Sequence, residues 1–222
     1  MRASSTLRIA LLVGAICVLA AGQDAPISDA ASSESKGMPP RATPADYQAH
    51  TQAGALTVAA EFMRHSVPTP EATYNTEDYI VVEAALFGSP QAKTRLSIGD
   101  FSLRVNGKKA PLPSQPYGIT FKSLKDPEWE PPIKPDTKSK PTLDQGGSQA
   151  NSNSFPTIVR MPIELKRTMQ QRVQKASMAE GDRALPQAGL LYFEYRGKPE
   201  SIRSLELVYN GPAGNVVVAL QP

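Results

Sequence analysis

Residues 79–87 read Tyr-Ile-Val-Val-Glu-Ala-Ala-Leu-Phe, and this stretch decides the fold class. Its side chains are apolar on both alternating faces, with Glu83 as the one exception. A short apolar run of this kind is typical of a strand that is covered on both sides. The stretch therefore predicts a β-strand near the centre of a sheet.

Stretches with a period of two surround this strand. Residues 56–62 alternate through Leu56, Val58, Ala60 and Phe62, as a half-buried strand does. Further candidates are residues 101–105, followed by the turn-forming pair Asn106-Gly107, and residues 157–161, 190–195, 204–209 and 216–220, the last two flanking a loop at 210–214. About seven short strands with regular turn signals predict a mainly β fold, an antiparallel immunoglobulin-like sandwich.

One segment, residues 164–180, favours a helix instead. Pro162 lies just before it and Gly181 follows it as a stop signal. Its apolar side chains form a narrow stripe at helical spacing, whereas its basic side chains surround the helix. We expect the stripe to dock on the sandwich. A helix that lies on a lipid surface or binds a partner is the alternative, but such a helix gathers its charges on one face.

The first 22 residues have the order of a secretory signal peptide. Arg2 and Arg8 precede an apolar run from Ile9 to Ala21, and small residues precede Gln23. The run is shorter than the roughly 20 residues of a membrane-spanning helix, so we expect cleavage rather than a retained anchor. The sequence predicts a periplasmic or secreted protein with no transmembrane segment after cleavage.

Cleavage of the signal also changes the charge and the cysteine content of the chain. The signal contains two of the 24 basic residues, no acidic residue and the single cysteine, Cys17. The remaining chain is close to neutral, which gives no electrostatic argument for nucleic-acid binding. A chain without cysteine has no disulfide and no thiolate ligand or nucleophile.

Two segments are too poor in large apolar side chains to fold by themselves. Residues 23–48 are expected to be a flexible tether, and residues 126–154, rich in Pro, Gly, Asn and Ser, a disordered insertion. The rest, from residue 49 to residue 222, suits a single domain.

The strand sequences resemble a known family. The runs YIVVEAALFG (79–88), DFSLRVNGKK (100–109), LLYFEYRGK (190–198) and SLELVYNGPAG (204–214) look like those of exported bacterial immunoglobulin-like domains of largely unknown function. The fold of that family is similar to the immunoprotective extracellular antigen of mycobacteria. The resemblance covers roughly residues 55–110 and 188–220; it implies the sandwich and export, and it brings no catalytic residues.

Catalytic and metal-binding signals are weak. His50 and His65 are the only histidines, and neither lies in a zinc-binding spacing. A Gly-x-Ser-x-Gly motif is absent, and Glu77-Asp78 before a strand is explained more simply as a solvated pair. We predict no cofactor, no metal and no enzymatic activity. A cleft that joins His65 to a carboxylate and a serine would favour an enzyme instead.

Trp129 is the only tryptophan and lies among prolines that stiffen an extended segment. Its indole would either pin the start of the insertion to the domain or project to bind a sugar ring or a protein pocket. Tyr117 and Phe121 lie near it in the sequence. These three residues are the candidates for binding a partner.

The sequence therefore predicts an exported, non-enzymatic module that binds a protein or glycan of the cell envelope, or supports the envelope. The alternative is an extracytoplasmic glycan-active enzyme or an accessory subunit of one.

Overall fold

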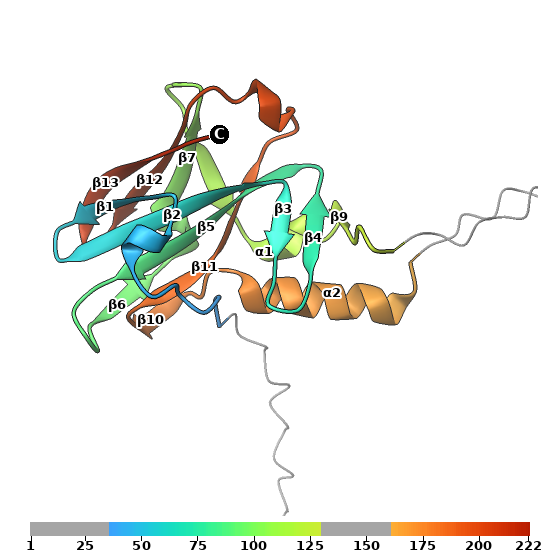
Figure 1. Cartoon of the computed structure of the whole chain (residues 1–222), viewed down its shortest axis with the longest axis horizontal. Helices are drawn as coiled ribbons and strands as arrows, with labels where there is room; N and C mark the ends of the chain where they lie inside the picture. The colour runs from blue at the N-terminus through green and yellow to red at the C-terminus, as the bar shows by residue number, and fades with distance from the viewer. Residues whose placement is uncertain (1–35, 130–160) are drawn as a thin grey trace, which may run out of the picture. The chain divides into compact units, whose positions relative to one another are not determined.

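The computed structural model describes residues 36–129 and 161–222, and this part of the chain is mainly β (Figure 1). Eight strands form one antiparallel sheet. In spatial order they are β1 (Ala49–Ala53), β2 (Leu56–Arg64), β5 (Tyr79–Phe87), β11 (Gln187–Glu194), β8 (Leu112–Gln115), β7 (Phe101–Val105), β12 (Leu205–Gly211) and β13 (Gly214–Leu220).

This sheet curls until its two edge strands approach one another. The Gln48 side chain, next to β1, donates a hydrogen bond of 2.9 Å to the backbone carbonyl of Gln221, just after β13. Apolar side chains from both halves of the curled sheet fill its interior, and Val58, Leu103, Phe193 and Leu207 are fully buried there. The sheet is therefore almost closed around a single core.

The predicted central strand is confirmed. β5 pairs with β2 on one side and with β11 on the other, and all its residues are buried except Tyr79 and Phe87 at its ends, which are half-buried. The two faces of β5 contribute to different clusters. Ile80 and Val82 face the interior of the curled sheet, whereas Val81 faces a second cluster outside it.

The outer cluster lies under α2 (Ile163–Ala176) and a small sheet of β3 (Ser66–Pro68), β4 (Thr73–Thr76) and β9 (Leu124–Lys125). Met169, Val173 and Ala176 of α2 are buried against it. The predicted apolar stripe is thus confirmed, and it docks on the β structure. α1 (Tyr117–Thr120) borders the same cluster.

The predicted end of the helix at Glu180 was wrong. α2 ends at Ala176, because the following residues adopt an extended conformation and the Met178 N–H donates a 3.0 Å hydrogen bond to the Leu190 carbonyl of β11. Gly181, expected as a helix stop, begins β10 (Gly181–Ala184), which pairs with β6 (Lys93–Leu96).

Residues 36–48 form an N-terminal strap across the outer face of β2, β5 and β11. The prediction of a flexible tether was therefore wrong for these residues. The Met38 N–H donates a 2.8 Å hydrogen bond to the Ala188 carbonyl, and Tyr47 is buried against Ala59, Ala85 and Ala188. A single 3-10 turn, η1 (Pro44–Asp46), ends the strap. The chain therefore packs on the sheet well before residue 49.

Arg41 fastens the strap to the sheet. Its guanidinium donates a hydrogen bond of 2.9 Å to the Glu83 carboxylate, whose side chain is only 4% exposed, and it also pairs with Glu61. Its guanidinium carbon also lies 4.5 Å from the centre of the Tyr47 ring. The one charged residue of the central strand is thus neutralised by the segment that was expected to be a tether.

Two turns differ in detail from the prediction. Asn106 and Gly107 both have positive φ, as a tight turn requires, but β8 rejoins β7 only at Leu112. The Asn106 side chain instead binds the backbone of Ser201, Arg203 and Ser204, after η3 (Pro199–Ser201). Residues 210–214 form a tighter hairpin than expected, since Gly211 pairs directly with Gly214. The remaining 3-10 turn, η2 (Ile98–Asp100), leads into β7.

Most of the predicted insertion, and residues 157–160 of a predicted strand, lie outside the described residues; Met161 is not in a strand. Within residues 36–129 and 161–222, no helix is both long and apolar enough to cross a membrane.

Candidate functional site

Trp129, Tyr117 and Phe121, the candidates from the sequence, do not form one cluster. The Tyr117 and Phe121 rings lie 5.8 Å apart and pack against the outer cluster beside α2. Trp129 is half-buried at the end of a turn, where its backbone N–H donates to the Asp126 carbonyl, and its ring stacks on no other ring of the described residues. The structure therefore brings together two of the three.

The two histidines are far apart in the fold. His50 is exposed on the edge strand β1, whereas His65 is half-buried in the turn between β2 and β3. The His65 Nδ1 lies 2.6 Å from the Tyr79 carbonyl oxygen and donates to it, which leaves Nε2 as the unprotonated nitrogen of the neutral ring. Over the described ranges, no three His, Cys, Asp or Glu side chains gather to hold a metal ion.

A β-bulge immediately precedes His65. The register between β2 and β5 shifts between Phe62 and Arg64, and Arg64 has a φ of 57°, a left-handed conformation that is uncommon outside glycine. Bulges redirect the side chains that follow them. Met63, Arg64 and His65 consequently all line the same depression in the surface.

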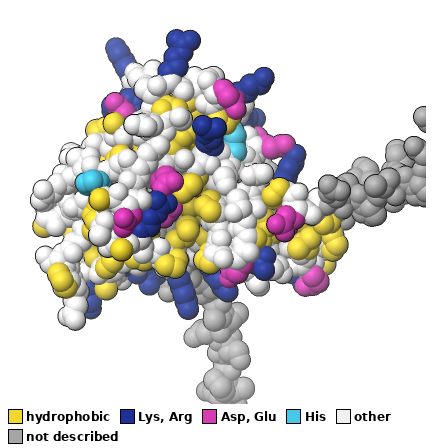
Figure 2. Space-filling view, in the orientation of Figure 1, with side chains coloured by type: hydrophobic (Ala, Val, Ile, Leu, Met, Phe, Trp, Pro, Cys, Tyr) yellow, Lys and Arg dark blue, Asp and Glu magenta, His cyan; other side chains and the backbone are white. Residues whose placement is uncertain are grey.

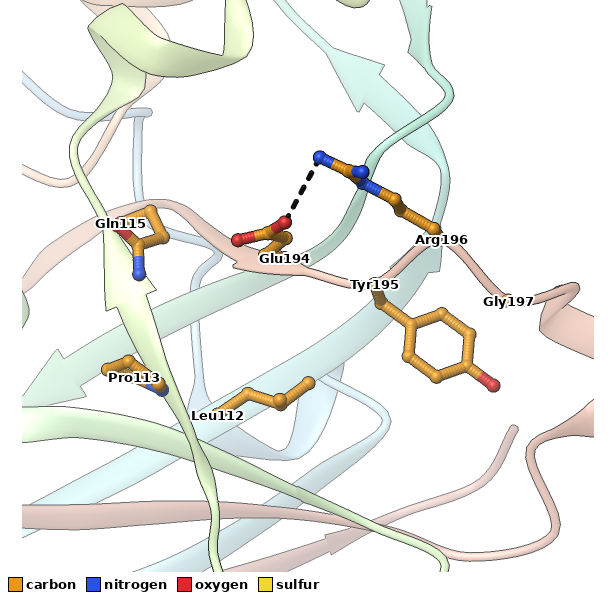
Figure 3. A pocket seen from close by; sticks show the side chains of 7 residues that line it. All are labelled: Leu112, Pro113, Gln115, Glu194, Tyr195, Arg196 and Gly197. Carbon is orange, nitrogen blue, oxygen red and sulfur yellow. Dashed lines mark ion pairs between the residues drawn. The ribbon is translucent and has the colours of Figure 1, made fainter.

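This depression and a neighbouring one meet at Arg196 and Gly197, and we call them together the Arg196 groove. The wider recess has a volume of about 670 Å³ and lies between the β2–β3 turn, the end of β4 and the segment 196–199. The narrower recess, of about 470 Å³, lies between β8 and the end of β11 (Figure 3). The residues that line the narrower recess are Leu112, Pro113, Gln115, Glu194, Tyr195, Arg196 and Gly197.

Arg196 is an exposed side chain of this groove, and two carboxylates pair with it. Its guanidinium lies 3.3 Å from a Glu194 carboxylate oxygen and 3.7 Å from an Asp78 carboxylate oxygen. Figure 3 shows Arg196 and Glu194 pointing toward one another. Both carboxylates also act on Tyr79, whose phenol has a raised pKa because of burial first and these negative charges second.

Tyr195 points away from Arg196, toward the opposite side of the strand end (Figure 3). Its hydroxyl lies 2.8 Å from the Ser201 hydroxyl, which fixes the end of the ring. The ring passes close to Gly197, where a Cβ atom would lie 2.7 Å from the ring carbon that bears the hydroxyl. The lack of a side chain at Gly197 therefore leaves room for the end of the Tyr195 ring.

A histidine, a serine and a carboxylate, the residue types of a hydrolase's catalytic site, all line the wider recess. They are His65, Ser66 and Glu77. They are not linked as a proton relay, however. Among the described residues His65 has its hydrogen bond to the Tyr79 carbonyl, while Glu77 pairs with Lys125. Ser66 directly follows His65 in the chain, and no hydrogen bond joins the two.

Sequence reasoning missed this groove because its parts are distant in the chain. The predicted solvated pair, Glu77 and Asp78, lies at its border, and both carboxylates pair with basic residues. Arg64 and Arg196 could not be identified from the sequence. An arginine does not by itself indicate a left-handed φ, and it does not indicate that a strand end lies beside another loop. The Gly197 and Pro199 stop signals were the nearest indication of a loop there.

Comparisons of the chain with protein-family models, with curated proteins and with solved structures find no match.

Proposed function

We propose that this chain is an exported, non-enzymatic module that binds a protein or glycan of the cell envelope, with the Arg196 groove as its binding site. The observation that carries the proposal is the joining of two open recesses at Arg196, with charged, amide and aromatic side chains around them. Such side chains on the loops of a rigid β scaffold are typical of a recognition surface.

Export is the part of the proposal that comes from the sequence. The charged, apolar and small-residue order of residues 1–22 supports cleavage before Gln23. The mass of the protein recovered outside the cytoplasm checks this, since the cleaved chain begins at Gln23; a protein that retains residues 1–22 would contradict it.

We also propose an immunoglobulin-like sandwich related to the exported bacterial domains that the strand sequences resemble. The antiparallel pairing of β7, β12 and β13, which carry two of the resembling runs, supports this. The strap, α2 and the small sheet of β3, β4 and β9 would then be additions to that sandwich. In this family no shared activity accompanies the fold, which agrees with a binding role.

Replacing Arg196 with Gln tests the site. The Arg196 side chain is 74% exposed, so its ion pairs contribute little to stability and the variant should fold normally. Loss of one charge-assisted hydrogen bond to a ligand should weaken binding to isolated envelope fragments about tenfold. Co-sedimentation of the purified chain with these fragments measures the effect.

Arg167→Gln on α2 is the matched control, because Arg167 is also an exposed arginine that pairs with a glutamate, here Glu164. It should sediment like the wild type. Equal binding by all three proteins would show that the ligand does not use the Arg196 groove.

The enzymatic alternative is retained because His65, Ser66 and Glu77 line one recess. The Nδ1 hydrogen bond of His65 leaves Nε2 ready to accept a proton, which is the role of a general base. Hydrolysis of a glycan or an ester by the wild-type chain, lost in His65→Ala, would establish this alternative; the binding proposal predicts no turnover.

A further inference from the structure

We propose that the ligand of the Arg196 groove is an acidic glycan, a polysaccharide that carries carboxylate groups. This inference rests on the proposed function and adds the chemical class of the ligand.

The charge of the wider recess supports an anion. Three permanently basic side chains line it, those of Arg64, Arg196 and Lys198, against one acidic side chain, Glu77, which pairs with Lys125. Within the described part of the chain, Arg64 and Lys198 have no ion-pair partner. Two cations in an open recess are therefore available to a ligand.

The placement of Arg64 supports the same conclusion. Its φ of 57° is unfavourable for an arginine, and it occurs at the bulge that turns residues 63–65 into the recess. Strained residues of this kind cluster where proteins bind ligands. A guanidinium also suits a carboxylate particularly well, because it offers two parallel N–H donors.

The basic character continues beyond the groove. The Asn106 side chain holds the loop at residues 106–109 against the segment 201–204, so that Lys108 and Lys109 lie at the same end of the sheet as η3. Figure 2 shows Lys and Arg side chains along the upper part of the surface, around a histidine, with Asp and Glu side chains between them. An extended anionic chain would meet several of these cations in turn.

The neutral side chains of the recess favour a saccharide over a nucleic acid. Ser66 and Asn75 line it, and their hydroxyl and amide groups suit the hydroxyls of a sugar. The described residues that line the wider recess include no Phe, Tyr or Trp, and Tyr195 lines only the narrower recess. Single-stranded nucleic acids bind largely by stacking their bases on such rings.

The test compares binding of polygalacturonate, a polymer of carboxylate-bearing sugars, with that of a neutral glucan of similar length by calorimetry. We expect the wild-type chain to bind polygalacturonate, and to bind it more weakly as salt rises, because salt screens exposed charges. Arg64→Asn/Lys198→Gln should lower the affinity about tenfold or more. Asparagine is chosen because it tolerates the left-handed conformation at position 64.

Lys166→Gln/Lys175→Gln is the control, since it removes the same charge from exposed positions on α2 and should leave the affinity unchanged. Binding of the neutral glucan with equal affinity would overturn the acidic ligand and leave the binding function standing. Binding of poly-glutamate or an oligodeoxynucleotide in preference to both glycans would replace the glycan by another polyanion. Binding of none of these polymers, together with equal sedimentation of wild type and Arg196→Gln, would overturn both proposals.

Discussion

Gly189→Ala is expected to destabilise the fold by about 3 kcal/mol. Gly189 lies in the middle of β11, where the extended segment after α2 crosses against it. A Cβ atom at this position would lie 2.6 Å from the Met178 backbone nitrogen and 3.0 Å from the Ser177 carbonyl carbon. These are backbone atoms, so no change of rotamer can relieve the overlap. The 177–179 segment would have to move away from β11 and lose the hydrogen bond from Met178 to Leu190.

Urea unfolding measures this effect as a lower midpoint at an unchanged slope. Gly118→Ala in α1 is the control, because a Cβ atom there meets no atom within 4 Å and its φ is not positive. Alanine is favoured over glycine in a helix, so this variant should keep its stability or gain about 0.5 kcal/mol. A Gly189→Ala protein as stable as the wild type would show that the chain does not pass so close to β11.

Arg41→Met should also cost about 3 kcal/mol, because it leaves the Glu83 carboxylate buried without its cationic partner. Glu83 is paired with Glu61 across β5 and β2, and both contact Arg41. Glu61 is 31% exposed and can turn to water, whereas Glu83 is 4% exposed and cannot. We expect the variant to release the strap, and limited proteolysis should then cut within residues 36–48.

The double variant Arg41→Met/Glu83→Met separates the buried charge from the lost packing. When both partners of a buried pair become apolar side chains of similar length, the change in stability is often small. Urea unfolding should therefore restore most of the stability lost in Arg41→Met. A double variant as unstable as the single one would mean that the guanidinium contributes by its packing on Tyr47 rather than by its charge.

The sequence predicted a helix or strand correctly where apolar side chains recur along one or both of its faces. The run from Tyr79 to Phe87 identified the central strand, because a strand covered on both sides has no polar face. The stripe of Met169, Val173 and Ala176 identified α2 and its buried side for a related reason. These patterns depend on many residues at once, so no single exception hides them.

Short elements and long-range partners were not predictable in this way. β3, β4 and β9 have two to four residues each, which is too few for a period to show. The strap has hardly any large apolar side chain, and it is held instead by backbone hydrogen bonds, by Tyr47 and by Arg41. One signal was present: a lone glutamate in an apolar strand needs a basic partner, and Glu83 indicated that one exists without indicating which.

The candidate site was harder still to predict than the strap. Its two main segments, residues 63–66 and 196–199, are more than a hundred residues apart in the chain, and the bulge at Arg64 turns the first of them toward the recess that both line. The aromatic candidates from the sequence, Tyr117, Phe121 and Trp129, lie on other elements. We therefore propose recognition at the Arg196 groove and not at these rings.

Hydrogen–deuterium exchange of the purified chain, with and without saturating polygalacturonate, tests this placement most directly. We expect slower backbone exchange on binding at residues 63–66, at the end of β4 and at residues 195–199, with no change along β1 or β13. Slower exchange confined to residues 117–129, around Tyr117, Phe121 and Trp129, would contradict it.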